Sequence, residues 1–152
     1  MRVQYIVHKA THVGRGHLID FVNRQDSHAH IDWEITGQRT IIGIVCDGCS
    51  EGTTSEVGAT LASNFLVREV SRLVEQRVPI SVIPNVIYPT LLDFLRTVVN
   101  SYSFADSADR VTFIKNALLF TVVGFILKDS ETVVFITGDG TIIVNEHINY
   151  VD

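Results

Sequence analysis

Residues 40–48, Thr-Ile-Ile-Gly-Ile-Val-Cys-Asp-Gly, predict a central β-strand that runs directly into an acidic turn. The apolar residues of this stretch form a continuous run, which suits a strand buried on both faces. They are Ile41, Ile42, Ile44 and Val45. The strand is expected to end at Cys46, and Asp47-Gly48 is expected to form the turn that follows it.

The preceding segment, residues 27–35, predicts a partner strand with one buried face. Apolar and polar residues alternate along it, and a period of two is typical of a half-buried strand. The apolar set is Ala29, Ile31, Trp33 and Ile35, and the polar set is His28, His30, Asp32 and Glu34. A turn at Gly37-Gln38 would lead this strand back into residues 40–46. The start of one strand then lies beside the end of the other, so Asp26 and Asp47 can converge.

The rest of the chain predicts helices followed by more strands. Apolar residues at helical spacing predict a long helix over residues 54–77, which a Thr53-x-x-Glu56 capping box would begin and Pro79 would end. Further helices are expected over residues 84–102 and 107–116. Strands are expected over residues 3–7, 118–128, 131–137 and 141–145, with hairpin turns at residues 129–130 and 138–140. This order indicates an α+β domain with antiparallel sheets.

Length and composition argue against several classes of protein. A chain of 152 residues with 46% hydrophobic content can form one domain with a substantial core. The formal net charge of −5 and the lack of a Lys/Arg cluster argue against a nucleic-acid partner. No apolar run reaches the roughly 18 residues of a membrane span, and residues 1–4 do not resemble the start of a signal peptide. We therefore expect a cytoplasmic protein without membrane contact.

Two other patterns allow a metal or redox function. Cys46-Asp47-Gly48-Cys49 is formally a Cys-x-x-Cys pair, which occurs in redox sites and as half of a zinc site. A zinc site needs a second ligand pair, so two reduced thiols are the expected state. His28 and His30 share one strand face and could bind zinc, although a solvated or partner-facing pair is the more ordinary interpretation.

Asp47 is the most informative acid in the chain. It closes an apolar strand and is followed by Gly48, so a carboxylate and accessible backbone carbonyls come together at a strand end. Hard cations such as Mg²⁺ and Mn²⁺ prefer such oxygen ligands, and Asp26 could supply a second carboxylate. The alternative is that Asp47-Gly48 is only a turn and Asp26 only a polar residue at the start of a strand.

Four short stretches, taken in order, carry a family resemblance. They are Gly14-Arg15-Gly16-His17 followed by Gln25-Asp26, then Ile44-Val45-Cys46-Asp47-Gly48-Cys49-Ser50, then Ser55-Glu56-Val57-Gly58-Ala59-Thr60-Leu61-Ala62, and finally Val134-Phe135-Ile136-Thr137-Gly138-Asp139-Gly140. Their order and spacing resemble a bacterial branch of the protein phosphatase 2C family, also called the PPM-type or metal-dependent protein phosphatases. The second stretch resembles the Val-x-Asp-Gly-x-Gly segment of that family.

The resemblance implies an antiparallel β-sandwich flanked by helices and a site for two Mg²⁺ or Mn²⁺ ions. The family pattern gives Asp47 the role of bridging the two metals, and gives Gly48 a coordinating carbonyl. Asp26 would hold metal-bound water, so Asp26 and Asp47 are the expected catalytic residues. A water activated by the two metals would attack the phosphorus of a phosphoserine or phosphothreonine ester in a phosphoprotein substrate.

The departures from the family pattern matter as well. Gln25 stands where many members have Glu, and Phe21 stands where many have the phosphate-binding Arg, so His17 is the expected substitute for that Arg. The family's downstream metal-binding acids do not occur before Asp152. We therefore expect residues 1–152 to be the amino-terminal portion of a single PPM-type domain, with the sandwich incomplete, or a naturally shortened relative that is catalytically poor. The full-length form is expected to be the active phosphatase, and residues 1–152 alone are expected to be inactive. An exposed sheet edge could pair with a second copy in a homodimer, and a catalytically impaired phosphoprotein-binding module is the alternative function.

Overall fold

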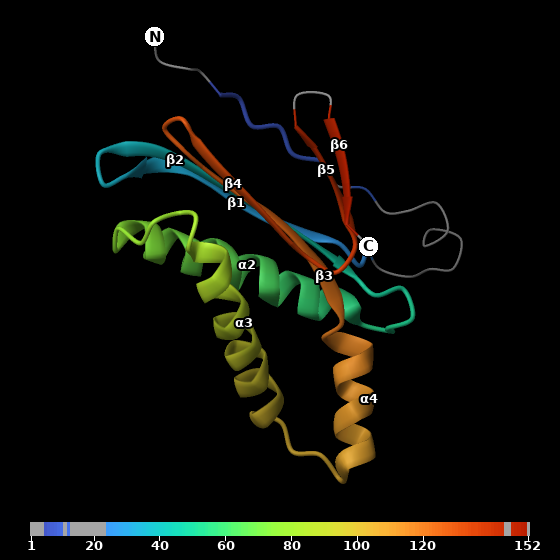
Figure 1. The fold of residues 1–152 in the computed structure, drawn as a ribbon. Coiled ribbons are helices and arrows are strands. Elements are labelled where there is room, and N and C mark those ends of the chain that lie inside the picture. Colours follow the sequence, from blue (N-terminus) through green and yellow to red (C-terminus); the bar gives the residue numbers. More distant parts are fainter. Residues whose placement is uncertain (1–4, 11, 13–23, 145–146, 152) are drawn as a thin grey trace.

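A computed structural model describes residues 5–10, 12, 24–144 and 147–151, and Figure 1 shows their arrangement. The elements in chain order are β1 (Ser27–Ile35), β2 (Gln38–Gly48), α2 (Ser55–Glu75), α3 (Ile83–Asn100), α4 (Ser107–Ala117), β3 (Phe120–Lys128), β4 (Glu131–Thr137), β5 (Gly140–Val144) and β6 (His147–Val151). Strands, helices and strands therefore follow one another as the sequence predicts.

Four of the strands form one antiparallel sheet in the order β1-β2-β3-β4. The strands β5 and β6 pair with each other in a separate two-stranded sheet. Figure 1 shows α2, α3 and α4 on one side of the four-stranded sheet and the β5–β6 ribbon on the other side. The predicted α+β class with antiparallel sheets is confirmed.

The core lies between the four-stranded sheet and α2. Successive strand residues point to opposite faces, and the core-facing residues of β2 are Ile42, Ile44 and Cys46, all buried. From α2, Leu66 and Val70 pack into the same core. The residues of β2 that alternate with this set, including Asp47, therefore lie on the sheet face turned away from the helices.

The helix at the centre of this core begins differently from its prediction. α2 starts at Ser55, and the side chain of its N-cap residue, Thr54, makes no capping hydrogen bond. Instead, the Thr54 N–H donates to the backbone oxygen of Asn116 (3.1 Å). This hydrogen bond joins the start of α2 to the last turn of α4. The predicted capping box from Thr53 is therefore wrong, because a contact with a distant part of the chain replaces the local cap.

The other two helices are close to their predicted ranges. α3 includes Pro84 in its first turn and carries Pro89 inside the helix, so the earlier of the two predicted starts is correct. α4 is capped by Asp106, whose carboxylate accepts hydrogen bonds from the N–H groups of Ala108 (2.7 Å) and Asp109 (2.9 Å). This is the ordinary N-cap arrangement, in which a side-chain oxygen satisfies N–H groups of the first turn.

The turn at residues 138–140 does not form the predicted hairpin. β4 and β5 belong to different sheets, and β5 pairs with β6 instead. Gly138 has a φ of 87°, and a Cβ added to Gly140 would lie 2.7 Å from a methyl group of Val123 in β3. The turn therefore carries the chain across β3 onto the sheet face opposite the helices. The strand β6 was not predicted, and residues 5–7, the described part of the predicted opening strand, do not form a strand.

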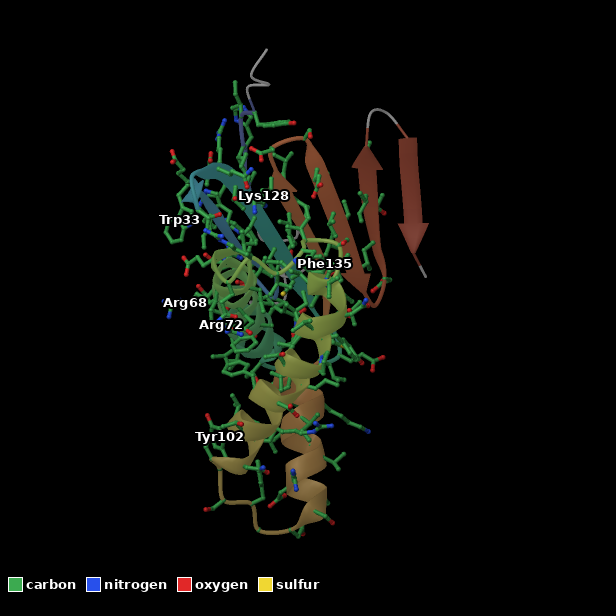
Figure 2. All side chains as sticks on the ribbon, turned by 60° about the vertical axis from the view of Figure 1, so that its left-hand side comes forward. Trp33, Arg68, Arg72, Tyr102, Lys128 and Phe135 are labelled. Carbon is green, nitrogen blue, oxygen red and sulfur yellow. The ribbon has the colours of Figure 1, made fainter. Side chains whose placement is uncertain are left out.

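The two large aromatic residues of the sheet have different environments. Phe135 is half-buried and packs against the core over Gly124, whereas Trp33 is 51% exposed although its strand position predicted burial. Trp33 lies on the edge strand β1, and Figure 2 shows it projecting from the side of the molecule while Phe135 lies among the side chains near α3. Among the described helices, none is long and apolar enough to cross a membrane.

Candidate functional site

The ladder between β1 and β2 brings two acids together. Ser27 pairs with Cys46, so the same register carried back by one residue places Asp26 opposite Asp47. Both residues lie on the face turned away from the helices, since residues directly opposite each other in a ladder share a face. They also line one cavity of about 380 Å³, together with Ala10, His12, Ser27, His28 and Val45. The structure therefore brings Asp26 and Asp47 to a common space.

Gly48 sits at the end of β2 in a space that only glycine fits. A Cβ added to it would lie 2.7 Å from the Oγ of Ser55 and 2.8 Å from the backbone oxygen of Gln25. Both separations are shorter than any relaxed contact, so the first turn of α2 and the start of β1 close tightly around this residue. The backbone that carries the Asp47 side chain is thereby held on two sides.

Gln25 holds the loop that follows Asp47. Its side chain is 3% exposed, and its Nε2 donates to the backbone oxygens of Gly52 (2.9 Å) and Cys49 (3.3 Å). An amide can donate to both carbonyls, whereas a carboxylate could donate to neither. The neutral residue at this position therefore ties the chain before Asp26 to the loop after Asp47. Sequence reasoning noted the change from Glu to Gln but missed this positioning role.

The donors in this cavity fit a hard divalent cation in part. The carboxylates of Asp26 and Asp47 offer the oxygen ligands that Mg²⁺ and Mn²⁺ prefer. Gly48, the predicted carbonyl ligand, follows Asp47 but is not among the residues that line the cavity. Across the described residues, however, no group of three or more His, Cys, Asp or Glu side chains is arranged to hold a metal ion. Asp26 and Asp47 would therefore leave much of each coordination sphere to water, backbone oxygens or groups outside the described part of the chain.

Two histidines of the cavity, His12 and His28, were not predicted as part of this site. His28 follows Asp26 by two residues and therefore shares its strand face, a signal that the alternation of residues 27–35 contains. His12 itself lies in neither a helix nor a strand, and the tertiary fold brings it to the cavity. His17, the predicted phosphate-binding residue, lies outside the described residues.

The two cysteines occupy different environments. Cys46 points into the core and is fully buried, whereas Cys49 lies half-buried in the loop after Gly48, and both thiols are free. Burial raises the pKa of the Cys46 thiol to about 12, so the thiolate that redox chemistry or zinc binding needs is strongly disfavoured. The placement of Cys46 thus argues against a zinc or redox site at Cys46-Asp47-Gly48-Cys49.

This buried thiol is expected to make the protein less stable in alkaline solution. In the unfolded chain Cys46 loses its proton near its ordinary pKa of 9.0, whereas in the folded chain it keeps the proton up to about 12. The folded state therefore binds more protons between these values, and the free energy of unfolding falls as the pH rises through them. The contribution of Cys46 to this loss between pH 8 and pH 10 is expected to be about 1.4 kcal/mol.

Urea unfolding of the wild type and of Cys46→Ala at both pH values measures this contribution. Other titrating groups affect both proteins alike, so the wild type should lose about 1.4 kcal/mol more than the variant between pH 8 and pH 10. Equal losses in the two proteins would show that the Cys46 thiol ionises in the folded state as readily as in the unfolded one.

Comparison with known proteins identifies a family for this fold. The family model described as "Protein phosphatase 2C" matches residues 13–151, which include Asp26, Asp47, Gly48 and all the strands and helices described above. No curated protein and no solved structure gives a significant match. Because the family match extends over most of the 152 residues, the chain belongs to the protein phosphatase 2C family.

Proposed function

We propose that this chain provides the metal-binding acids of a PPM-type phosphatase that hydrolyses phosphoserine and phosphothreonine in phosphoproteins. The observation that carries the proposal is the meeting of Asp26 and Asp47, from neighbouring strands, at one open cavity on the sheet face turned away from the helices. Membership of the protein phosphatase 2C family supports phosphatase chemistry at this place.

In this proposal the role of the two acids is to bind Mg²⁺ or Mn²⁺, with the carbonyl of Gly48 as a further oxygen ligand. Two carboxylates at adjacent ladder positions repel each other, and a divalent cation between them relieves that repulsion. When bound, such cations supply the positive charge that a phosphate ester requires and make a coordinated water more acidic. Gln25 keeps the two acid-bearing segments in register through its hydrogen bonds to Cys49 and Gly52.

The proposed function is tested by measuring cation binding and phosphate release separately. Mn²⁺ binding to the chain is followed by electron paramagnetic resonance, in which bound Mn²⁺ loses its free-ion signal. Phosphate release is measured from phosphoserine and phosphothreonine peptides with Mn²⁺, with Mg²⁺ and with excess EDTA, and a phosphotyrosine peptide is the specificity control. We expect weak Mn²⁺ binding and little phosphate release by residues 1–152 alone, and release by the full-length form that EDTA abolishes. Release that continues at full rate in EDTA would contradict a metal-dependent reaction.

One observation favours a second candidate, a phosphoprotein-binding module with little or no catalytic activity. The described residues bring two carboxylates to the cavity and no third side chain arranged to ligate a metal. A module of this kind would bind Mn²⁺ and retain a phosphopeptide without releasing phosphate. The same two measurements distinguish the candidates, because both bind Mn²⁺ and only the enzyme releases phosphate.

A further inference from the structure

His28 occupies a defined place beside the two acids. It pairs with Val45 in the β1–β2 ladder, two residues along each strand from the position where Asp26 faces Asp47. The four residues form a square on the sheet face turned away from the helices, with His28 next to Asp26 along β1. All four line the cavity of about 380 Å³.

A phosphate group in this cavity needs donors as well as cations. Its non-bridging oxygens accept hydrogen bonds from N–H groups, and Arg commonly supplies these donors. No Lys or Arg is among the described residues that line the cavity. Arg24 lies close by, but its Nε donates to the backbone oxygen of Asp26 (3.0 Å) and its side chain does not line this space.

Among the described side chains that line the cavity, only those of His12 and His28 carry N–H groups. Asp26 and Asp47 carry acceptors, and the hydroxyl of Ser27 bonds to the hydroxyl of Ser63 (2.9 Å) on the helix side of the sheet. Of the two histidines, His28 is fixed by the β1–β2 ladder, whereas His12 itself lies in neither a helix nor a strand. The strand therefore makes His28 the better positioned donor.

The environment of the ring indicates which nitrogen is available. Nδ1 of His28 is enclosed and has no hydrogen-bond partner in the part of the chain that the structure describes. A proton on the enclosed Nδ1 would be a buried donor without an acceptor, which favours the tautomer with the proton on Nε2. Because His28 lines the cavity and its Nδ1 is enclosed, Nε2 is the ring nitrogen considered for a contact with a group in the cavity.

We propose that His28 is a substrate-binding residue whose Nε2–H donates a hydrogen bond to a non-bridging oxygen of the phosphate group held at Asp26 and Asp47. The neutral imidazole is sufficient for this role, since the interaction needs a donor and not a positive charge. This inference rests on the proposed function, because the phosphate enters a cavity with two carboxylates only together with divalent cations.

The test uses inorganic phosphate as the probe and the chain preloaded with Mn²⁺. Isothermal titration calorimetry gives the Mn²⁺ affinity first and then the phosphate affinity of the loaded protein. His28→Ala is expected to weaken phosphate binding by about 10-fold or more, the usual loss for one hydrogen bond to a charged group. Its Mn²⁺ affinity should stay within about twofold of the wild type.

Two variants make the result specific. His28→Gln places an amide Nε2 near the position of the lost imidazole nitrogen, so it should recover much of the phosphate affinity. His30→Ala is the matched control, because His30 lies on the same strand face but outside the cavity, beside Lys9 (Nζ to Nδ1, 3.3 Å). It should bind phosphate like the wild type, and circular dichroism checks the folding of each variant.

Each outcome bears on one of the two proposals. A wild type that binds no Mn²⁺ would overturn the metal-dependent function and this inference with it. A wild type that binds Mn²⁺ but no phosphate would overturn the inference, as would equal phosphate affinities in the wild type and His28→Ala. An equal loss of Mn²⁺ affinity in His28→Ala would show that His28 is a metal ligand instead.

Discussion

Replacement of Asp47 by Asn is expected to abolish metal-dependent phosphate release while leaving the fold intact. Asn retains one oxygen and the size of the side chain but removes the negative charge that attracts a divalent cation. Loss of groups that merely orient a metal ligand costs about 10- to 100-fold in affinity, so loss of the ligand charge itself should weaken Mn²⁺ binding by roughly 100-fold or more. Hydrolysis should fall by about 1,000-fold, which corresponds to roughly 4 kcal/mol of lost stabilisation of the transition state.

The fold should tolerate this change because the side chain of Asp47 is exposed at the end of β2. The free energy of unfolding is expected to change by no more than about 1 kcal/mol. Asp139→Asn is the matched control, since Asp139 is an exposed acid in the turn between β4 and β5 and does not line the cavity. Its Mn²⁺ affinity and hydrolysis should match the wild type. Unchanged Mn²⁺ affinity in Asp47→Asn would remove Asp47 from the metal site.

The second large effect is expected for stability, from Gln25→Glu. At neutral pH this change puts a buried carboxylate against the backbone oxygens of Cys49 and Gly52, which now accept hydrogen bonds from the Gln25 amide. The carboxylate can donate to neither oxygen, and an uncompensated buried charge is costly. We expect the free energy of unfolding to fall by about 3 kcal/mol at pH 7, with part of the loss recovered in acid as the new carboxyl is protonated.

Urea unfolding at pH 7 and pH 5 measures both parts of this expectation. Gln76→Glu is the matched control, because Gln76 is exposed and its Oε1 already accepts a hydrogen bond from Arg72 (2.9 Å). That variant should stay within about 0.5 kcal/mol of the wild type. If Gln25→Glu were equally mild, the amide would not be holding the loop after Asp47. Weaker Mn²⁺ binding in a folded Gln25→Glu would further support a positioning role.

The parts of the fold that the sequence predicted best are those whose pattern reflects burial on one side. β1 runs over residues 27–35 as predicted, because a strand with one buried face must keep its alternation in phase with the sheet. α2 and α3 were predicted from apolar residues at helical spacing. A helix that packs on a core needs this apolar face wherever its ends lie. Convergence of Asp26 and Asp47 followed from the hairpin register alone.

The parts that were wrong depend on contacts between distant segments. Thr53 and Glu56 match a capping box, yet α2 begins at Ser55 and is anchored to Asn116 of α4, which local sequence cannot reveal. Gly138-Asp139-Gly140 has the composition of a hairpin turn, but the chain crosses β3 there and enters another sheet. A turn signal predicts that the chain reverses and not which strand it meets next.

The same limit applies to the site. The sequence predicted that Asp26 and Asp47 converge because one directly precedes β1 and the other lies at the end of β2. His12 was missed because nothing near it in the sequence relates it to either strand. The role of Gln25 was missed for a similar reason, since its two acceptors lie 24 and 27 residues away in the chain. Hydrogen bonds over such separations appear only once the fold is known.

The backbones that carry Asp26 and Asp47 differ in how firmly the sheet holds them, because β2 is paired on both sides. Asp47 belongs to a strand paired on both sides, with β1 and β3, so a shift of its backbone would break two ladders at once. Asp26 precedes β1, an edge strand with a single neighbour, and its backbone can adjust at a lower cost. If the two acids bind cations as proposed, Asp26 would adjust to differences in cation radius, and Asp47 would be the more rigidly held ligand.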